Sequence, residues 1–266
     1  MVGKIPVIVK LKDQLSVKGK GGETLYGFLL SSIAEVDEEF ASYLHNFRGI
    51  KPISISPIFP LSSNFEVRNG RMYLKDKSEF KFIVNSLNMQ TTEVLIKTLA
   101  NVERKKTMKI GNAKCTIKKI CLKENEGGVF VKYKDMLTHN EERRQVDVKI
   151  ISPLSFRKNG KQIIFPEPYL FFNSLMKIFN SFSNVKIPSI LENRFQEIEV
   201  NKFSLRSEMW EFSKYKIIGC IGYVGFRFGN RFNEEEVKFL NTLCRFANFS
   251  GVGYKRTMGM GMVEVK

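Results

Sequence analysis

Histidine and cysteine are scarce in this sequence, which has two histidines and four cysteines among 266 residues. The cysteines show neither CxxC spacing nor pairing with histidine; they are Cys115, Cys121, Cys220 and Cys244. This pattern argues against a zinc site and predicts reduced, mostly buried thiols. The acidic runs at Asp37 and Glu234 open helical patterns and do not resemble a two-metal site. We therefore expect no metal and no cofactor.

Long apolar runs are also missing. No stretch approaches the ~20 apolar residues that a membrane-spanning helix needs. Residues 1–12 alternate like a strand and lack the apolar core of a signal peptide. We expect a soluble, cytoplasmic protein with no membrane partner.

Acidic residues are few relative to basic ones. Lys and Arg number 43 against 27 Asp and Glu, a formal net charge of +16. Such an excess favours polyanionic partners, with nucleic acid first. The alternative is that the charge serves solubility alone, although the basic residues cluster at turns.

The order of expected elements repeats along the chain. In the first half we expect strands at 5–12 and 52–59, an Asn69-Gly70 hairpin over 65–74, and strands at 107–123; the expected helices are 24–34, 37–44 and 78–87. In the second half we expect a strand at 146–152, an Asn159-Gly160 hairpin, and strands at 196–206 and 214–228; the expected helices are 168–182 and 234–248. Both halves read β-α-β-β-α-β, the order of the ferredoxin-like motif.

We therefore predict an α+β protein with two tandem ferredoxin-like domains, which share the topology of RNA-recognition modules. The charged stretch 124–145 contains Gly127-Gly128 and marks the boundary. The predicted domains are residues 1–125 and 126–266.

A glycine-rich loop follows the last helix and precedes a short final strand. Two Gly-x-Gly pairs bracket five residues; the glycines are Gly251, Gly253, Gly259 and Gly261. Between the pairs lie Tyr254, Lys255 and Arg256. Glycine accepts positive φ and lets another backbone come close. A loop with glycine shoulders and cations at its tip suits a phosphate backbone, which its amides would contact.

This loop, the basic charge and the paired β-α-β-β-α-β order resemble the RAMP superfamily. Within it, the chain is similar to the CRISPR-associated endoribonucleases that cut precursor crRNA in each repeat. The segment Tyr43-Leu-His45-Asn-Phe-Arg-Gly49-Ile-Lys51-Pro resembles the histidine segment of that family, and Val148-Lys-Ile-Ile-Ser-Pro-Leu154 resembles the start of its second domain.

The resemblance implies metal-free cleavage, in which a 2′-hydroxyl attacks the adjacent phosphate and leaves a 2′,3′-cyclic phosphate and a 5′-hydroxyl. Such a step needs a base, an acid and positive charge on the phosphorane. By the resemblance, His45 takes the proton-transfer role, for which imidazole is suited, and Lys51 stabilises the phosphorane. The alternative for His45 is an exposed helix-end residue.

Relatives place a catalytic tyrosine about fifteen residues before the histidine, where this chain has Leu30. Tyr26 lies one helical turn earlier on the same face and is the candidate substitute. The alternative for Tyr26 is a core aromatic. His139, the second histidine, is expected in a polar loop.

For RNA binding we expect the glycine loop to act first, through its glycines and through Tyr254, Lys255 and Arg256. Further candidates lie at basic turns: Lys18, Lys20, Arg68, Arg71, Arg157, Lys158 and Lys161. Each of these is also consistent with an ordinary surface charge. The expected partner is CRISPR repeat RNA within precursor crRNA, and a crRNA-guided effector complex is a second partner that the resemblance implies.

Two alternatives to a nuclease are open. One is a non-catalytic RAMP subunit that binds crRNA in an effector complex, and the other is an unrelated two-domain RNA chaperone. The sequence leaves a monomer and a homodimer both open.

Overall fold

The first half of the chain builds an antiparallel sheet around a central strand, β1. The computed structural model describes residues 1–138 and 143–265. The sheet order is β3-β7-β1-β9-β8, with β10 also pairing with β1 and β4 with β7. Its strands are β1 (Val2–Leu11), β3 (Ile53–Ile55), β4 (Phe59–Pro60), β7 (Glu79–Ser86), β8 (Met108–Ile110), β9 (Ala113–Ile120) and β10 (Val129–Val131). Because β10 joins this sheet, the first sheet includes residues beyond 125.

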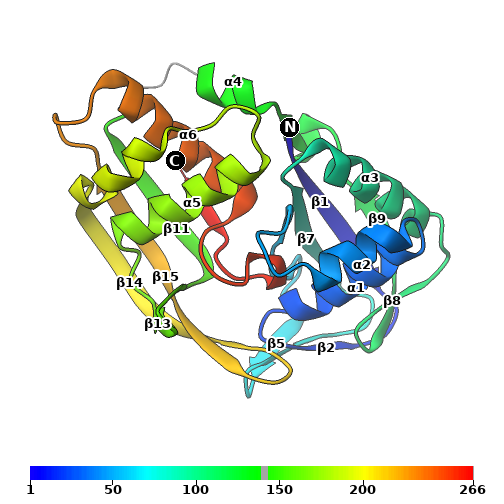
Figure 1. Ribbon diagram of the computed structural model, residues 1–266. Coiled ribbons are helices and arrows are strands. Elements are labelled where there is room, and N and C mark those ends of the chain that lie inside the picture. Colours follow the sequence, from blue (N-terminus) through cyan, green and yellow to red (C-terminus); the bar gives the residue numbers. More distant parts are fainter. Residues whose placement is uncertain (139–142, 266) are drawn as a thin grey trace.

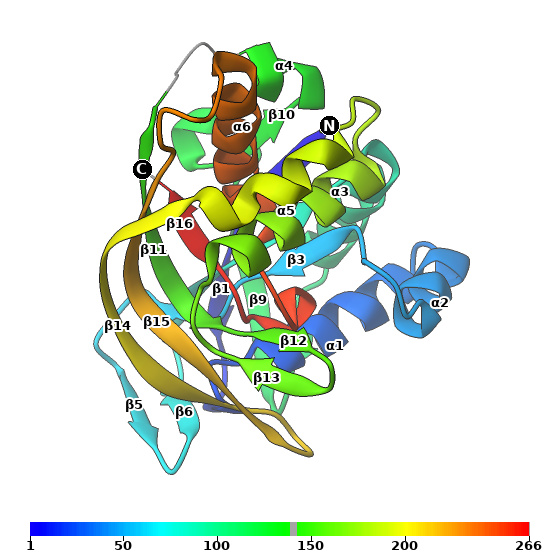
Figure 2. The same ribbon diagram turned by 60° about the vertical axis from the view of Figure 1, so that its left-hand side comes forward.

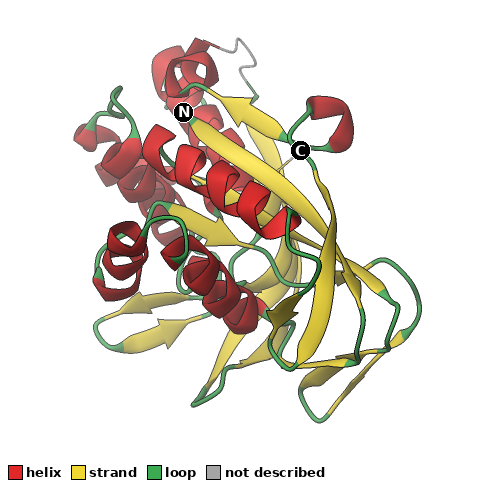
Figure 3. Ribbon diagram, turned by 90° about the vertical axis from the view of Figure 1, so that its right-hand side faces the viewer, coloured by secondary structure: helices red, strands yellow, loops and turns green. Residues whose placement is uncertain are grey.

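Two helices cover one face of this sheet. Alternate β1 residues Ile5, Val7 and Val9 are fully buried, as the period of two in a strand requires. They pack with the apolar faces of α1 (Gly22–Ala34) and α3 (Met89–Glu103), which lie together on the same side of β1 (Figures 1 and 3). The short helix α2 (Glu38–Asn46) is capped by Asp37, as its acidic start predicts.

The predicted helix at 78–87 is wrong. Residues Glu79–Ser86 form β7, which lies between β1 and β3. Phe80, Phe82 and Val84 alternate into the core, so the period is two rather than 3.6. The helix begins eleven residues later than predicted, at Met89 of α3, where the Asn88 side chain accepts a hydrogen bond from the Thr91 amide.

The second half of the chain forms a four-stranded antiparallel sheet in the order β14-β15-β11-β16. Its strands are β11 (Gln145–Leu154), β14 (Glu199–Glu211), β15 (Lys216–Arg227) and β16 (Val263–Val265). Helices α5 (Pro168–Phe182) and α6 (Glu234–Ser250) pack on one face and contribute the largest core cluster. In the first sheet β1 lies between β7 and β9, and in the second β11 lies between β15 and β16. The orders β3-β7-β1-β9 and β14-β15-β11-β16 therefore correspond strand by strand.

Both predicted Asn-Gly hairpins are confirmed, but neither belongs to a main sheet. The first, β5 (Phe65–Arg68) and β6 (Arg71–Leu74), pairs with β2 (Leu15–Lys18). The second is β12 (Phe156–Lys158) and β13 (Lys161–Ile163). The remaining elements are α4 (Tyr133–Thr138) and the 3₁₀ helices η1 (Glu124–Glu126), η2 (Ser189–Glu197) and η3 (Arg256–Met258).

The turn between β14 and β15 reaches across to the first half of the chain (Figure 2). The Ser213 amide and hydroxyl donate to the Glu23 carboxylate at 2.7 and 2.8 Å. Lys18 donates to the Ser213 carbonyl and Lys20 pairs with Glu208. These bonds join α1 and the β2–α1 turn to the second sheet.

A second junction lies at the end of α6. The buried Ser54 hydroxyl on β3 donates to the Phe249 carbonyl at 2.7 Å. This bond fixes the point at which the chain leaves α6 and enters the glycine-rich loop. All four cysteines are buried free thiols, as predicted. Among the described residues, no helix is long and apolar enough to cross a membrane.

Candidate functional site

The glycine-rich loop, residues 251–261, runs from α6 to β16 and packs against both halves of the chain. Two of its glycines are required by close approaches at positive φ. At Gly261 (φ 68°) a Cβ would lie 1.9 Å from the Val252 carbonyl oxygen, and at Gly253 (φ 78°) it would lie 2.4 Å from that of Ser155. Any other residue would collide with protein backbone there. The glycines therefore hold the loop in shape against its own chain.

Most amides of the loop are already hydrogen-bonded within the protein. Those of Val252, Tyr254 and Gly261 donate to carbonyls, and the Gly253 amide donates to the Ser174 hydroxyl at 3.1 Å. Within the described part of the chain, the amides of residues 255 to 257 and of Gly259 have no acceptor. The expectation that the loop presents its amides broadly to phosphate therefore narrows to these four amides.

Arg256 is not at the exposed tip, contrary to the sequence expectation. Its side chain is only 8% exposed, and its guanidinium donates to the Ser250 carbonyl at 2.7 Å. Burial lowers the pKa of Arg256 to about 10. The hydrogen bond instead ties the loop to the last turn of α6. Lys255, at positive φ of 59°, carries the accessible charge.

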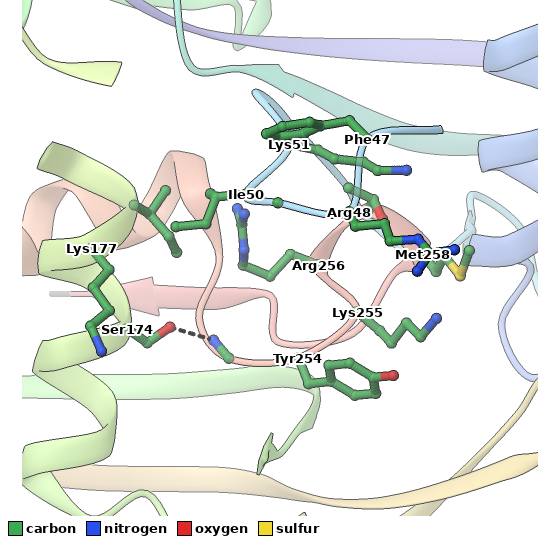
Figure 4. Close-up of a pocket in the computed structure, with 14 residues that line it drawn as sticks. Phe47, Arg48, Ile50, Lys51, Ser174, Lys177, Tyr254, Lys255, Arg256 and Met258 are labelled. Carbon is green, nitrogen blue, oxygen red and sulfur yellow. Dashed lines mark hydrogen bonds between the residues drawn. The ribbon is translucent and has the colours of Figure 1, made fainter. Parts of the chain in front are cut away.

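A cleft of about 500 Å³ lies between this loop, α5 and the segment that follows α2. Lys51, Arg48, Lys177 and Lys255 line it together with Arg256, and no acidic side chain among the described residues does. Figure 4 shows Ser174 and Lys177 on the α5 side, Arg48 and Lys51 on the opposite segment, and the loop running between them. Five cations around one cleft favour an anionic ligand.

Two of the three predicted catalytic residues are directly bonded. The Lys51 ammonium donates to the Tyr26 hydroxyl at 2.9 Å and to the His45 carbonyl at 3.3 Å. Burial, reinforced by the Lys255 charge, lowers the pKa of Lys51. The His45 ring is exposed but is not among the residues that line the cleft, and its Nδ1 lies 3.0 Å from the Asn46 side-chain oxygen.

Tyr26 is buried at 6% exposure, and its hydroxyl donates to the Leu44 carbonyl at 3.1 Å. Burial raises the pKa of Tyr26, and the Lys255 charge opposes that rise. The side chain does not line the cleft. Tyr26 is thus a core aromatic, the alternative stated in the sequence analysis, and it also contacts Lys51 directly.

The other predicted RNA contacts divide by location. Lys18 donates to the Ser213 carbonyl in the β14–β15 turn, and Lys20 pairs with Glu208 on β14, so both ammonium groups are engaged within the protein. Arg68 stacks on Tyr73, and Arg71 donates to the Ser16 hydroxyl, both away from the cleft. The β12–β13 hairpin carries the remaining three, Arg157, Lys158 and Lys161. Of these, Arg157 lies over the Tyr254 ring at 5.1 Å. His139 lies outside the described residues.

Comparison with known proteins finds similarity to one family. The model of the CRISPR-associated endoribonuclease Cas6 family matches residues 148–263. A curated Cas6 of Mycobacterium tuberculosis is 25% identical over 127 residues, 47% of this chain and 40% of that protein. One of Streptococcus thermophilus is 27% identical over 134 residues, 48% of this chain and 54% of that protein.

Solved structures agree over the whole length. A Thermus thermophilus Cas6 in a product complex superposes with a TM-score of 0.81 at 18% identity, covering 100% of both chains. A structure described as a RAMP protein binding different RNA substrates has a TM-score of 0.59 at 16% identity, covering 99% of each chain. These likenesses show the mixed α+β fold. In sequence, the chain is similar to the Cas6 family over residues 148–263, which is less than half of its length. The regions matched in sequence span 40% and 54% of these curated Cas6 relatives.

Two cations of the cleft are absent from the sequence prediction. Arg48 lies three residues after His45 in the segment that resembles the Cas6 histidine motif, so proximity alone was a usable signal. Lys177 is the exposed cation on the otherwise apolar stretch Leu175–Phe179 of α5. Nothing in the linear sequence connects it to residues 48–51.

Proposed function

We propose that the chain is a metal-independent endoribonuclease that cleaves precursor crRNA within each CRISPR repeat. The observation that carries this proposal is the cleft in which Lys51, Arg48 and Lys255 meet with no described carboxylate, where the Lys51 ammonium also binds the His45 carbonyl. An anionic phosphodiester fits this charge, and similarity to the Cas6 endoribonuclease family suggests the reaction class.

In the proposed reaction, the 2′-oxygen attacks the adjacent phosphorus, and the bond from phosphorus to the 5′-oxygen breaks. His45 exchanges the protons, because its exposed ring is free to reach an RNA lying in the cleft. The cations stabilise the phosphorane, whose charge exceeds that of the substrate. The products are a 2′,3′-cyclic phosphate and a 5′-hydroxyl, and no metal takes part.

In this scheme Tyr26 acts as a positioning residue. Its hydroxyl holds the Lys51 ammonium and is itself bonded to the Leu44 carbonyl. A tyrosine with both hydroxyl partners inside the protein is poorly placed to exchange protons with RNA. Lys51 is therefore the residue through which Tyr26 affects the rate.

We infer that the two halves are tandem ferredoxin-like domains and that RNA lies across the glycine-rich loop between them. The shared strand order supports the first inference. For the second, Lys255, Tyr254 and the three free amides of residues 255 to 257 supply phosphate and base contacts at one place. The division at residues 125 and 126 stays a prediction, as do the cytoplasmic location and the oligomeric state.

A non-catalytic crRNA-binding subunit is the second candidate. The engagement of the Tyr26 hydroxyl and the presence of Leu30 at the expected tyrosine position favour it. Both candidates bind repeat RNA through the same cleft, so only cleavage separates them.

The deciding experiment is incubation of the purified protein with the host's CRISPR repeat RNA in EDTA. We expect one cut per repeat, and no cut in RNA with a 2′-deoxy nucleotide at the scission position. We expect His45→Ala to slow cleavage by about 10²–10⁴-fold, the usual contribution of a general acid–base group. Tight binding without cleavage by the wild-type protein would select the binding subunit.

A further inference from the structure

A second hollow of about 500 Å³ adjoins the cationic cleft and shares Tyr254 and Lys255 with it. The hairpin β12–β13 forms one wall, through Arg157, and the start of β15 forms another, through Tyr215 and Lys216. Figure 4 shows Tyr254 and Lys255 projecting from the loop in a different direction from Arg256. The hollow is therefore continuous with the proposed cleavage site but built from different elements.

Tyr215 offers a supported aromatic face in this hollow. It is 42% exposed, and its ring packs on the buried Phe212 with centroids 4.9 Å apart and a tilt of 31°. The Lys255 ammonium lies 5.5 Å from the centroid of Tyr215. Because Phe212 already restricts the ring, Tyr215 loses little further conformational entropy when a planar group stacks on it.

The charges of the hollow match a phosphate. In residues 1–138 and 143–265, no acidic side chain lines it. Lys216 is paired with Glu211 at 2.5 Å, so its charge is largely satisfied. Arg157 and Lys255 instead lie over the Tyr254 ring, at 5.1 and 5.3 Å. Among the described residues, neither has a carboxylate within ion-pair distance, so both charges stay available to an anion.

We propose that this hollow binds one unpaired nucleotide of the RNA, with its base stacked on Tyr215 and its phosphate between Arg157 and Lys255. The inference rests on the proposed function, since it takes RNA as the ligand of the adjoining cleft. A paired nucleotide does not fit the role, because its base is already stacked in a helix. The hollow thus selects RNA that has an unpaired nucleotide at a set distance from the cut.

The test uses repeat RNA of the host's CRISPR array with 2-aminopurine at one unpaired position at a time. We expect the 266-residue chain to quench the probe at one position. Tyr215→Ala should abolish that quenching and weaken binding by about 5- to 150-fold, the range for one base stacked on an aromatic side chain. Tyr215→Phe should retain both. Tyr223→Ala is the matched control, because Tyr223 is an exposed tyrosine on β15 outside the hollow.

Unchanged quenching and affinity in Tyr215→Ala would overturn the proposal. Single-turnover cleavage of the same RNA separates this failure from that of the proposed function. Cleavage without Tyr215-dependent quenching rejects the hollow and leaves the nuclease standing. Quenching that depends on Tyr215, in the absence of cleavage, supports the hollow and rejects the nuclease.

Discussion

The Lys51 ammonium donates a hydrogen bond of 2.9 Å to the Tyr26 hydroxyl, joining two residues 25 positions apart. Tyr26 sits on α1, and Lys51 sits on the segment that leads from α2 to β3. The bond holds the Lys51 ammonium at the edge of the cleft. The catalytic part of the site therefore depends on how α1 and α2 pack.

Replacing Tyr26 by Phe tests whether this tyrosine positions Lys51 or transfers a proton. We expect Tyr26→Phe to slow single-turnover cleavage by about 10-fold, less than the ~10²–10⁴-fold of a lost acid–base group. The loss of its hydrogen bonds should lower the free energy of unfolding by about 1 kcal/mol. Lys51→Ala is the comparison, and a loss in Tyr26→Phe as large as that of His45→Ala would contradict the positioning role.

The alkaline side of the pH–rate profile should report Lys51. Burial and the Lys255 charge lower its pKa, so the cation that stabilises the phosphorane is lost at a lower pH than for an ordinary lysine. The cleavage rate should therefore fall on the alkaline side before the ordinary lysine pKa of about 10.4 is reached.

Lys255→Gln removes the neighbouring like charge, so the pKa of Lys51 should rise and the falling limb should move to higher pH. The measurement is single-turnover cleavage at saturating protein, from neutral pH upward. A limb that stays in place would show that another group titrates there.

Lys255 and Arg256 are adjacent cations, and we expect Lys255 to contribute to RNA binding and Arg256 to stability. Lys255→Ala should weaken RNA binding and reduce the slope of log affinity against log salt by about 0.7, the contribution of one phosphate contact on a single strand. Its effect on stability should stay within about 0.5 kcal/mol. Arg256→Ala should instead cost about 2 kcal/mol of stability, because the buried bond to the Ser250 carbonyl is lost.

Urea unfolding and RNA binding by fluorescence anisotropy at several salt concentrations check both variants. If Arg256→Ala unfolded like the wild type and changed only the salt slope, Arg256 would be an RNA contact rather than a loop anchor.

Two glycines of α1 give a matched pair for the packing of the loop. A Cβ at Gly22 would lie 2.2 Å from the Met258 carbonyl oxygen, whereas at Gly27 it would meet nothing within 4 Å. Gly27→Ala should stabilise the protein by about 0.5–1 kcal/mol through helix propensity. Gly22→Ala should destabilise it by about 1–3 kcal/mol, because the loop must move. Thermal unfolding of the two variants measures the difference, and equal effects would show that the loop does not rest on α1.

Local signals predicted the elements whose causes are local. Asn69-Gly70 and Asn159-Gly160 turn because these residues accept positive φ, and α6 starts where Asn233 and Glu236 form a capping box. Strand β7 was predicted as a helix although Phe80, Phe82 and Val84 recur in it with a period of two, and its pairing partners are not local. Residues 79–86 are extended because β1 and β3 lie on either side of them, and no sequence window contains those neighbours.

The sequence by itself determined the basic charge, the glycine-rich loop and the segment from His45 to Lys51. Each of these is a property of composition or of residues close together in the chain. Only the tertiary structure decided which cations face the cleft. Lys20 is neutralised by Glu208, 188 positions away, and Arg256 is buried under α6, while Lys177 of α5 joins the cleft. The residue type gives the charge of a side chain, but the group that pairs with this charge is decided only when distant segments pack together.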